Sequence, residues 1–285
     1  MADQRIVIVT DSTACIPQHV LNGVNVPVIP LWLIWGDERF RDGVDIDQHT
    51  FYRRLPHSKV FPTTSQPSAG EFIEFFQQGS VGADAIVGAF ISSKISGTVQ
   101  SALAAQDQLK QQLDIRVIDS LSTSMGLGFV VLAAIRAAAA GKSVDEVVAA
   151  AERMRERVNV LFVVDTLEYL HRGGRIGGAK RFLGTALSIK PILHLEDGSI
   201  EALTQVRTKR KAVNQLLEII EERLAGRRIA EVAVLDVDAP TEGDSLAKQI
   251  TKEFDASELI RTSVSPVIGA HAGPGTVGVV FYAEE

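Results

Sequence analysis

Runs of apolar residues alternate with amphipathic segments along the first half of the chain. Five such runs predict strands, and they occupy residues 5–10, 26–35, 84–91, 115–119 and 159–165. The runs are continuous rather than alternating, which is typical of strands covered on both faces in a parallel sheet. Because helical patterns separate them, the first half predicts a Rossmann-like α/β domain.

The most apolar helical segment is GLGFVVLAAIRAAAAG, residues 126–141. Arg136 interrupts it, and the segment is shorter than a bilayer requires, so we predict a buried helix and no transmembrane segment. Two other helices begin with a capping box, in which Ser68 and Ser143 each precede a glutamate by three residues.

The second half of the chain has a different pattern. Asp197-Gly198 lies between two alternating apolar arms and predicts a β-hairpin. The elements expected after it are a helix at 209–225, a strand at 229–237, a helix at 243–254 and a final strand at 277–283. This order predicts a smaller α+β domain with antiparallel pairing.

Length and composition favour two domains. The chain has 285 residues, of which 46% are apolar, and this is more than one core usually serves. We therefore expect an α/β protein with a mostly parallel N-terminal domain at 1–160 and a smaller α+β C-terminal domain at 161–285. The boundary rests on the change of pattern near residue 160.

The charge balance limits the choice of partner and compartment. The formal net charge of −6 makes nucleic acid a poor default partner. Cys15 is the single cysteine, so no internal disulfide can form, and the start of the sequence has no signal-peptide pattern. We expect a cytoplasmic protein without stable membrane insertion.

Two hydroxyl-rich segments precede predicted helices, FPTTSQPSAGEF at 61–72 and ISSKISGTVQSA at 91–102. Each has more hydroxyls than one helix cap can use. Backbone N–H groups at such strand-to-helix junctions favour an anion, and hydroxyls add further donors. Because no phosphate-binding loop motif is present, a single charge such as a carboxylate fits better than a triphosphate. The alternative is that these hydroxyls only cap and turn the chain.

Other chemistry has less support in the sequence. Ser245-x-x-Lys248 lacks the companion motifs of a serine nucleophile, and Cys15 is better explained as a small buried apolar residue than as a reactive thiol. The six histidines have no metal-ligand spacing. His271 differs from the others because it lies in the glycine-rich segment GAHAGPGT, where the backbone can approach a ligand closely.

A locally basic segment, YLHRGGRIGGAKRF at 169–182, combines four glycines with four cationic residues. It is suited to a phosphate or to the acidic surface of a partner, and the alternative is a solvated turn. Arg207 adds positive charge further along the chain.

Seven motifs in fixed order resemble the DegV family. They are TDSTA (10–14), TTSQPS (63–68), ISSKISGTVQSA (91–102), DSLSTSMGLG (119–128), TLEYLHRGGRIG (166–177), IKPIL (189–193) and AHAGPGT (270–276). The resemblance covers essentially the whole chain. It implies a bacterial two-domain α/β protein that binds a long-chain fatty acid such as palmitate, expected between its domains. In some members this protein is the acyl-carrying subunit of a two-component fatty acid kinase, and a separate subunit uses the ATP.

The resemblance also implies roles for individual positions. Thr64 and Ser96 correspond to residues that contact the fatty-acid carboxylate. The other positions implied to lie near the head group are Ser65, Ser93, Gly97 and His271. Arg175 and Arg207 correspond to positions linked to productive interaction with the kinase. Cys15 departs from the family, which commonly has an acidic residue there.

The leading hypothesis is therefore a fatty-acid-binding protein with no catalytic residues, metal or cofactor of its own. It would present the acyl carboxylate to an ATP-dependent kinase subunit. The alternative is a small-molecule enzyme in which the hydroxyl loops and the GGR segment at residues 173–175 bind a phosphorylated substrate. In that case His271 would act as the acid or base.

Overall fold

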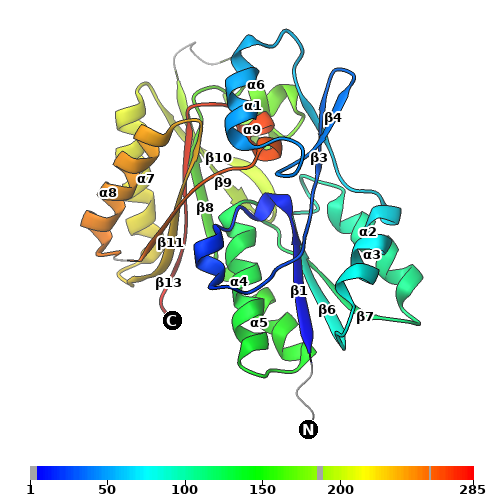
Figure 1. The fold of residues 1–285 in the computed structure, drawn as a ribbon. Helices are drawn as coiled ribbons and strands as arrows, with labels where there is room; N and C mark the ends of the chain where they lie inside the picture. Colours follow the sequence, from blue (N-terminus) through cyan, green and yellow to red (C-terminus); the bar gives the residue numbers. More distant parts are fainter. Residues whose placement is uncertain (1–4, 185–188, 257) are drawn as a thin grey trace. The chain divides into compact units, whose positions relative to one another are not determined.

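The computed structural model describes residues 5–184, 189–256 and 258–285, and these form two compact units (Figure 1). Unit 1 contains residues 1–47 and 60–156, and unit 2 contains residues 48–59 and 157–285. The chain thus passes into unit 2 close to the predicted boundary at 160. Segment 48–59 also belongs to unit 2, which one boundary near residue 160 does not predict. The domain limits 1–160 and 161–285 remain a prediction.

Unit 1 is built on a parallel sheet, as the continuous apolar runs predict. Its strand order is β2-β1-β6-β7 and all neighbours are parallel. The strands are β1 (Ile6–Asp11), β2 (Val28–Ile29), β6 (Ala85–Phe90) and β7 (Asp114–Asp119). Every residue of β6 is buried, which explains why this run contains no polar position.

The helices of unit 1 follow the strands in the alternation expected of an α/β domain. They are α2 (Ala69–Gly79), α3 (Thr98–Leu109), α4 (Met125–Ala139) and α5 (Val144–Arg157), with short 3-10 turns η1 (Ser12–Ala14) and η2 (Gln18–Leu21). Phe72 and Phe76 of α2 pack against Phe90 of β6, and the rings of Phe72 and Phe90 meet edge to face at 5.1 Å. The helix predicted at 126–141 is present as α4, but it is continuously buried only in its first half, from Met125 to Leu132, whereas Arg136 and Ala139 are exposed.

The predicted strand at 26–35 is wrong as a single element. β2 joins the parallel sheet, whereas β3 (Trp32–Trp35) pairs antiparallel with β4 (Glu38–Arg41) and β5 (Thr63–Ser65) in a separate small sheet. Pro30 lies at the break and has no N–H group to continue a ladder. The next N–H group, that of Leu31, donates instead to Ser12 Oγ at 3.1 Å.

Unit 2 is built on a six-stranded sheet of order β10-β9-β8-β13-β11-β12. Its strands are β8 (Asn159–Val163), β9 (Lys190–Glu196), β10 (Ser199–Val206), β11 (Ile229–Val237), β12 (Leu259–Ser263) and β13 (Thr276–Ala283). The pairing is antiparallel except between β11 and β12, so the expected α+β character is present. The Asp197-Gly198 hairpin is confirmed, with both residues at positive φ.

The run at 159–165 was expected to extend the parallel set, and this is wrong. Its strand β8 lies between β9 and β13, antiparallel to both. Leu161 and Val163 pack into one core of unit 2, while Phe162 and Val164 pack into another. A strand covered on both faces has a continuous apolar sequence whatever its direction, so the pattern alone does not distinguish the two cases.

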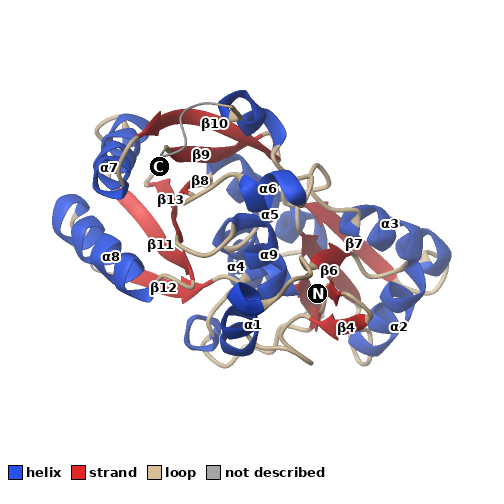
Figure 2. Ribbon diagram, turned by 90° about the horizontal axis from the view of Figure 1, so that it is seen from above, coloured by secondary structure: helices blue, strands red, loops and turns tan. Residues whose placement is uncertain are grey.

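Helices cover the sheet of unit 2. They are α6 (Glu168–Arg172), α7 (Lys209–Leu224), α8 (Pro240–Phe254) and α9 (Pro266–Ala272), with the 3-10 turn η4 (Gly177–Phe182). Helices α7 and α8 lie along the same face (Figure 2) and share its core through Leu216, Ile220, Leu246 and Ile250. Helix α8 begins three residues before its predicted start because Pro240 is suited to the first turn. Strand β12 and helix α9 were not predicted.

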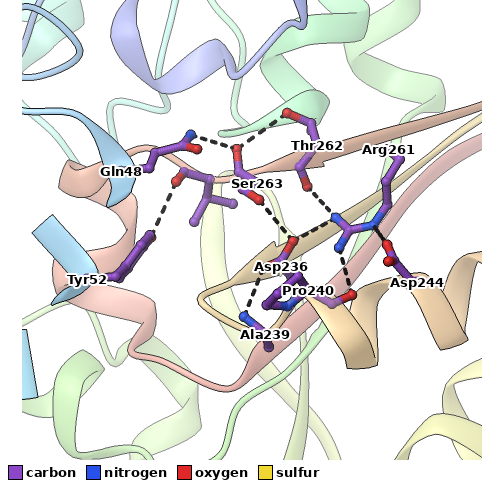
Figure 3. Close-up of polar contacts among 10 residues, drawn as sticks. Gln48, Tyr52, Asp236, Ala239, Pro240, Asp244, Arg261, Thr262 and Ser263 are labelled. Carbon is purple, nitrogen blue, oxygen red and sulfur yellow. Dashed lines mark hydrogen bonds and ion pairs between the residues drawn. The ribbon is translucent and has the colours of Figure 1, made fainter. Parts of the chain in front are cut away.

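Segment 48–59, which contains α1 (Gln48–Arg54) and η3 (Leu55–His57), is bonded to unit 2 (Figure 3). Gln48 Nε2 donates to the carbonyl of Ser263 at 3.1 Å, and Tyr52 Oη donates to the carbonyl of Val264 at 3.3 Å. The Tyr52 ring lies so close to Gly269 that any Cβ there would overlap it. These contacts explain why this short segment belongs with the second unit.

Candidate functional site

The hydroxyl-rich segments lie largely at one edge of the parallel sheet in unit 1. Strands β1, β6 and β7 run parallel, so the loops that follow Asp11, Phe90 and Asp119 leave the sheet at the same edge. Two bonds join these loops directly. The Ile91 N–H donates to Asp11 Oδ2 at 2.8 Å, and the Ser92 N–H donates to the carbonyl of Ser122 at 2.8 Å.

Asp11 holds the first two loops together. Its carboxylate is fully buried and accepts from both the N–H and the hydroxyl of Thr13, at 2.9 and 2.5 Å, as well as from Ile91. Burial raises the pKa of Asp11 above its usual value, although these three bonds act in the opposite direction. The TDSTA motif therefore has a structural role in unit 1: it ties η1 to the end of β6.

The TTSQPS segment forms β5 and the start of α2. Thr64 pairs with Leu33 and Ser65 with Trp32 in the small antiparallel sheet, and both side chains are half-buried. The capping prediction for Ser68 is confirmed, because Ser68 Oγ accepts from the Glu71 N–H at 3.2 Å and Glu71 accepts from the Ser68 N–H at 2.8 Å. The hydroxyls of Thr64 and Ser65 are thus not needed to cap the helix.

The TTSQPS segment lies against the second hydroxyl loop. The side chain of Gln66 packs on Gly97, where a Cβ would come within 2.9 Å of Gln66 Nε2. A side chain at position 97 would therefore require the Gln66 amide to move. The four implied head-group residues Thr64, Ser65, Ser96 and Gly97 are thereby brought into neighbouring segments of unit 1.

Ser96 and Ser93 also contribute to the shape of the second loop. Ser96 Oγ accepts from the Thr98 N–H at 3.3 Å and shares a hydrogen bond of 2.8 Å with Thr98 Oγ1, at the start of α3. The Ser93 N–H donates to Asp119 Oδ1 at 3.2 Å. These contacts are of the kind that the capping alternative predicts. The assignment of Ser96 to a carboxylate remains a prediction.

A third loop, Ser122–Ser124, was missed by the sequence reasoning. Ser122 and Ser124 are 5% and 3% exposed, and the Oγ atoms of Ser122 and Ser124 and Oγ1 of Thr123 are buried without a hydrogen-bond partner among the described residues. An unsatisfied buried hydroxyl costs about 1–3 kcal/mol. The signal was available, because DSLSTSMGLG is a hydroxyl-rich segment between a strand and a helix, like the other two.

The backbone of this loop is strained. Ser124, at the N-cap position of α4, has φ 52° and ψ −143° and makes no capping bond with its side chain. Leu121 also has a positive φ, of 48°. Residues other than glycine hold such conformations at a cost of about 1–3 kcal/mol each. Strain and unsatisfied hydroxyls therefore occur within the same four residues.

Two of the implied residues lie together in unit 2, although the sequence assigned them different roles. The ring of His271 on α9 packs against Gly173, and Arg175 Nη1 donates to the carbonyl of Gly173 at 2.8 Å. Burial and, to a smaller extent, the charge of Arg175 together lower the pKa of His271 to about 4. His271 is consequently neutral near pH 7. Tyr169 packs against Gly273 beside the same segment.

Arg207 is exposed directly after β10, two residues before Lys209 and next to Val206, which pairs with Lys190 of β9. Lys190 and Lys209 contact Asp165 Oδ1 at 3.0 and 2.9 Å, and Lys209 also donates to the carbonyl of Gly275. Burial tends to raise the pKa of Asp165, but the two lysines outweigh it and the pKa is lowered. This corner of unit 2 is therefore locally cationic.

Among the described residues, no group of three or more histidine, cysteine, aspartate and glutamate side chains could hold a metal ion. None of the helices in that part of the chain has the length and apolar character needed to cross a membrane. Cys15 is half-buried at the end of η1, in the left-handed conformation.

The fold and site define a class of two-unit α/β proteins in which polar loops gather at the carboxyl edge of a parallel sheet. Residues 5–284 match the family described as an uncharacterised protein, DegV family, and this chain belongs to that family. A DegV domain-containing protein of Streptomyces coelicolor is 38% identical over 97% of this chain and 98% of its own.

Two solved structures are similar over almost the whole chain. A DegV family protein from Thermus thermophilus, described by its fatty acid binding, is 35% identical with a TM-score of 0.92, over 99% of this chain and 100% of that one. DegV from Bacillus subtilis, described as a fatty acid binding protein, is 31% identical with a TM-score of 0.88, over 99% and 100%. These structures have the same two-domain α/β fold.

Proposed function

We propose that this protein binds a long-chain fatty acid, such as palmitate, and holds its carboxylate with the hydroxyl loops of unit 1. The observation that carries the proposal is the gathering of these loops in one unit, with the TTSQPS segment packed on Gly97. Whole-length similarity to two fatty-acid-binding relatives supports it. The position of the acyl chain between the two domains remains a prediction.

The free energies of burying the acyl tail and of bonding the carboxylate indicate how the binding affinity is divided between them. Burial of roughly fifteen methylenes at about 0.8 kcal/mol each contributes on the order of 12 kcal/mol before ordering costs. Each charge-assisted hydrogen bond to the carboxylate adds about 1.5–3 kcal/mol. The tail therefore supplies most of the affinity, and the hydroxyls determine where the carboxylate lies.

We further propose that the bound acid is presented to a separate ATP-dependent kinase subunit, which forms an acyl phosphate. Arg175 and Arg207 would take part in that interaction. Arg175 lies beside His271, which the family resemblance implies to be near the head group, and this supports a role for Arg175 close to the bound carboxylate. A neutral His271 could donate a hydrogen bond without adding charge.

The alternative, an enzyme acting on a phosphorylated small molecule with His271 as acid or base, is weaker. A histidine with a pKa near 4 is a poor proton donor at neutral pH because little of it is protonated, and it is a weak base. The hydroxyl loops also contain few cationic side chains for a phosphate dianion.

Native mass spectrometry of freshly purified protein tests the proposal. A retained acyl chain, released on denaturation and identified by its mass, is the expected result. Protein that emerges without lipid, and that binds no palmitate after delipidation, would contradict the proposal. Retention of a phosphorylated polar molecule would favour the enzyme.

A further inference from the structure

The Ser122–Ser124 loop differs from the other hydroxyl groups at its edge of the sheet. Thr10 Oγ1 donates to the carbonyl of Ala89 at 2.8 Å, and Ser12 Oγ donates to Asp42 Oδ2 at 2.8 Å. By contrast, the hydroxyls of Ser122, Thr123 and Ser124 are buried and have no partner in the part of the chain that the structure describes. The neighbouring hydroxyls therefore form hydrogen bonds within the fold, whereas these three form none with the described residues.

These hydroxyls lie at the N-terminus of α4, a helix of 15 residues. The first turn of α4 contains no acidic residue, and Ser124 does not cap it with its side chain. The Gly126 N–H is instead taken by the carbonyl of Thr123, at 3.1 Å. The positive end of the helix dipole in a buried setting, with hydroxyl donors beside it, favours an oxyanion.

The charges around the loop are consistent with a single negative charge. Arg155 Nη1 donates to the carbonyl of Asp119 at 3.3 Å, which places a guanidinium at the end of β7. The carboxylate of Asp119 opposes an anion, but its Oδ1 accepts from the N–H groups of Ser93 and Leu121 at 3.2 and 3.0 Å. A dianion would need more positive charge than this setting offers.

We propose that Ser122, Thr123 and Ser124, with the N-terminus of α4, form an oxyanion site that takes a carboxylate or another oxyanion of single charge. The Ser92 N–H bond to the carbonyl of Ser122 joins this loop to the second hydroxyl loop. One source of the carboxylate is the bound fatty acid, and this source rests on the proposed function. The other source is a free small anion.

Two substitutions remove a hydroxyl without removing a bond that the fold uses. Ser122→Ala deletes a buried hydroxyl whose Oγ has no partner among the described residues. Ser124→Gly deletes the second hydroxyl and places a glycine where φ is 52°, a value that glycine adopts freely. We expect neither variant to melt at a lower temperature than the wild type in the absence of ligand.

Ser143→Ala is the matched control, because Ser143 is another helix-start serine of unit 1 but one that caps its helix. Its Oγ accepts from the Glu146 N–H at 3.4 Å, and its own N–H donates to Glu146 at 2.9 Å. This variant should melt at a lower temperature and bind ligands as the wild type does. It thus separates lost stability from lost binding.

Palmitate dissociation constants of the delipidated proteins form the first arm of the test. If the fatty acid supplies the carboxylate, Ser122→Ala and Ser124→Gly should each weaken binding about tenfold, the effect of one lost hydrogen bond to a charged group. The second arm titrates acetate and inorganic phosphate at about pH 5.5, where phosphate carries a single charge, and follows the backbone amide signals of residues 122–126 by NMR. If a free anion is the ligand, these signals shift in the wild type and stay in place in both variants.

Unchanged palmitate affinity in both variants, with loop signals unmoved by acetate and phosphate, would overturn the proposal and leave ordered water as the partner of these hydroxyls. Wild-type protein that binds no palmitate would contradict the proposed function alone, because the acetate and phosphate arm still decides whether the oxyanion site exists.

Discussion

Hydroxyl side chains in unit 1 fall into two groups by their bonding. Ser68 and Ser143 cap helices, whereas Thr64 and Ser65 lie half-buried on a short strand that has no helix to cap. Ser96 is intermediate, because its Oγ accepts from the Thr98 N–H and yet lies in the loop implied to hold the head group. The number of serines and threonines in a motif is thus a poor guide to the number that bind a ligand.

The double variant Thr64→Val with Ser96→Ala tests the head-group assignment. We expect palmitate binding to weaken by about 2–5 kcal/mol, since the carboxylate loses two side-chain donors but keeps backbone N–H groups and can partly protonate. The melting temperature without lipid should fall far less, by the small contribution of the Ser96–Thr98 contact. Dissociation constants and apo melting temperatures are the measurements. A folded variant with unchanged affinity would remove the two residues from the carboxylate site.

His271 makes the stability of unit 2 depend on pH. Its pKa is lowered from 6.5 to about 4, so between these values the unfolded chain binds a proton that the folded protein excludes. The contribution of neutral His271 is complete above pH 6.5 and is lost as the pH falls toward 4, a change of about 3 kcal/mol. Urea unfolding at pH 7 and pH 5 should show about 2 kcal/mol of this loss in the wild type and a smaller one in His271→Gln. His49→Gln, an exposed change on α1, is the control. If the free energy of unfolding depended equally on pH in all three proteins, His271 would not be the source of the pH dependence.

At the scale of elements, an ion-pair network connects β11, β12 and α8 and adjoins α1 (Figure 3). Asp236 accepts from the Ala239 N–H at 2.9 Å, from Ser263 Oγ at 3.0 Å and from Arg261 Nη1 at 2.7 Å. Because Ser263 also receives the bond from Gln48, the network reaches the one segment of unit 2 that precedes residue 157. The ends of β11 and β12 thereby hold α8 and lie beside the attachment of α1.

The two carboxylates that pair with Arg261 offer a direct comparison of buried and exposed ion pairs. The side chain of Asp236 is 2% exposed, whereas that of Asp244, paired with Arg261 at 3.0 Å, is 62% exposed. Asp236→Asn should cost about 3 kcal/mol because it leaves a guanidinium and a hydroxyl poorly matched in the interior. Asp244→Asn should cost at most about 1 kcal/mol.

Unfolding in urea measures this comparison, and the aromatic residues separate the two units. All three tyrosines, Tyr52, Tyr169 and Tyr282, belong to unit 2, whereas Trp32 and Trp35 belong to unit 1. The loss in Asp236→Asn should therefore appear first in tyrosine signals. Equal losses in the two variants would show that burial does not determine the strength of this pair.

At the scale of the whole molecule, the proposed function separates lipid retention from transfer to a partner. Arg207→Ala should leave palmitate affinity nearly unchanged and reduce acyl phosphate formation with a cognate kinase subunit, since Arg207 is exposed and lies outside the hydroxyl loops. We expect the same separation for Arg175→Ala. Loss of lipid retention in either variant would reassign that arginine to the head group. Arg175 is the more sensitive test because it lies beside His271.

The sequence by itself determined the elements whose signal is local. Continuous apolar runs predicted β1, β6 and β7, and capping boxes placed the starts of α2 and α5. The Asp197-Gly198 pair predicted a hairpin because its turn needs positive φ at two consecutive residues. Each of these signals depends on neighbours within a few residues along the chain. The ordered motifs also identified the family.

Only the tertiary structure decided which strands pair and which hydroxyls are satisfied. The direction of β8 and the transfer of β3 to a second sheet depend on partners distant in sequence, and apolar content is the same in either arrangement. Segment 48–59 belongs to unit 2 through bonds to residues 263 and 264, more than two hundred positions away. The three unsatisfied hydroxyls of Ser122–Ser124 could be identified only from the structure. A hydrogen bond depends on the positions of both donor and acceptor, and the sequence does not give those positions.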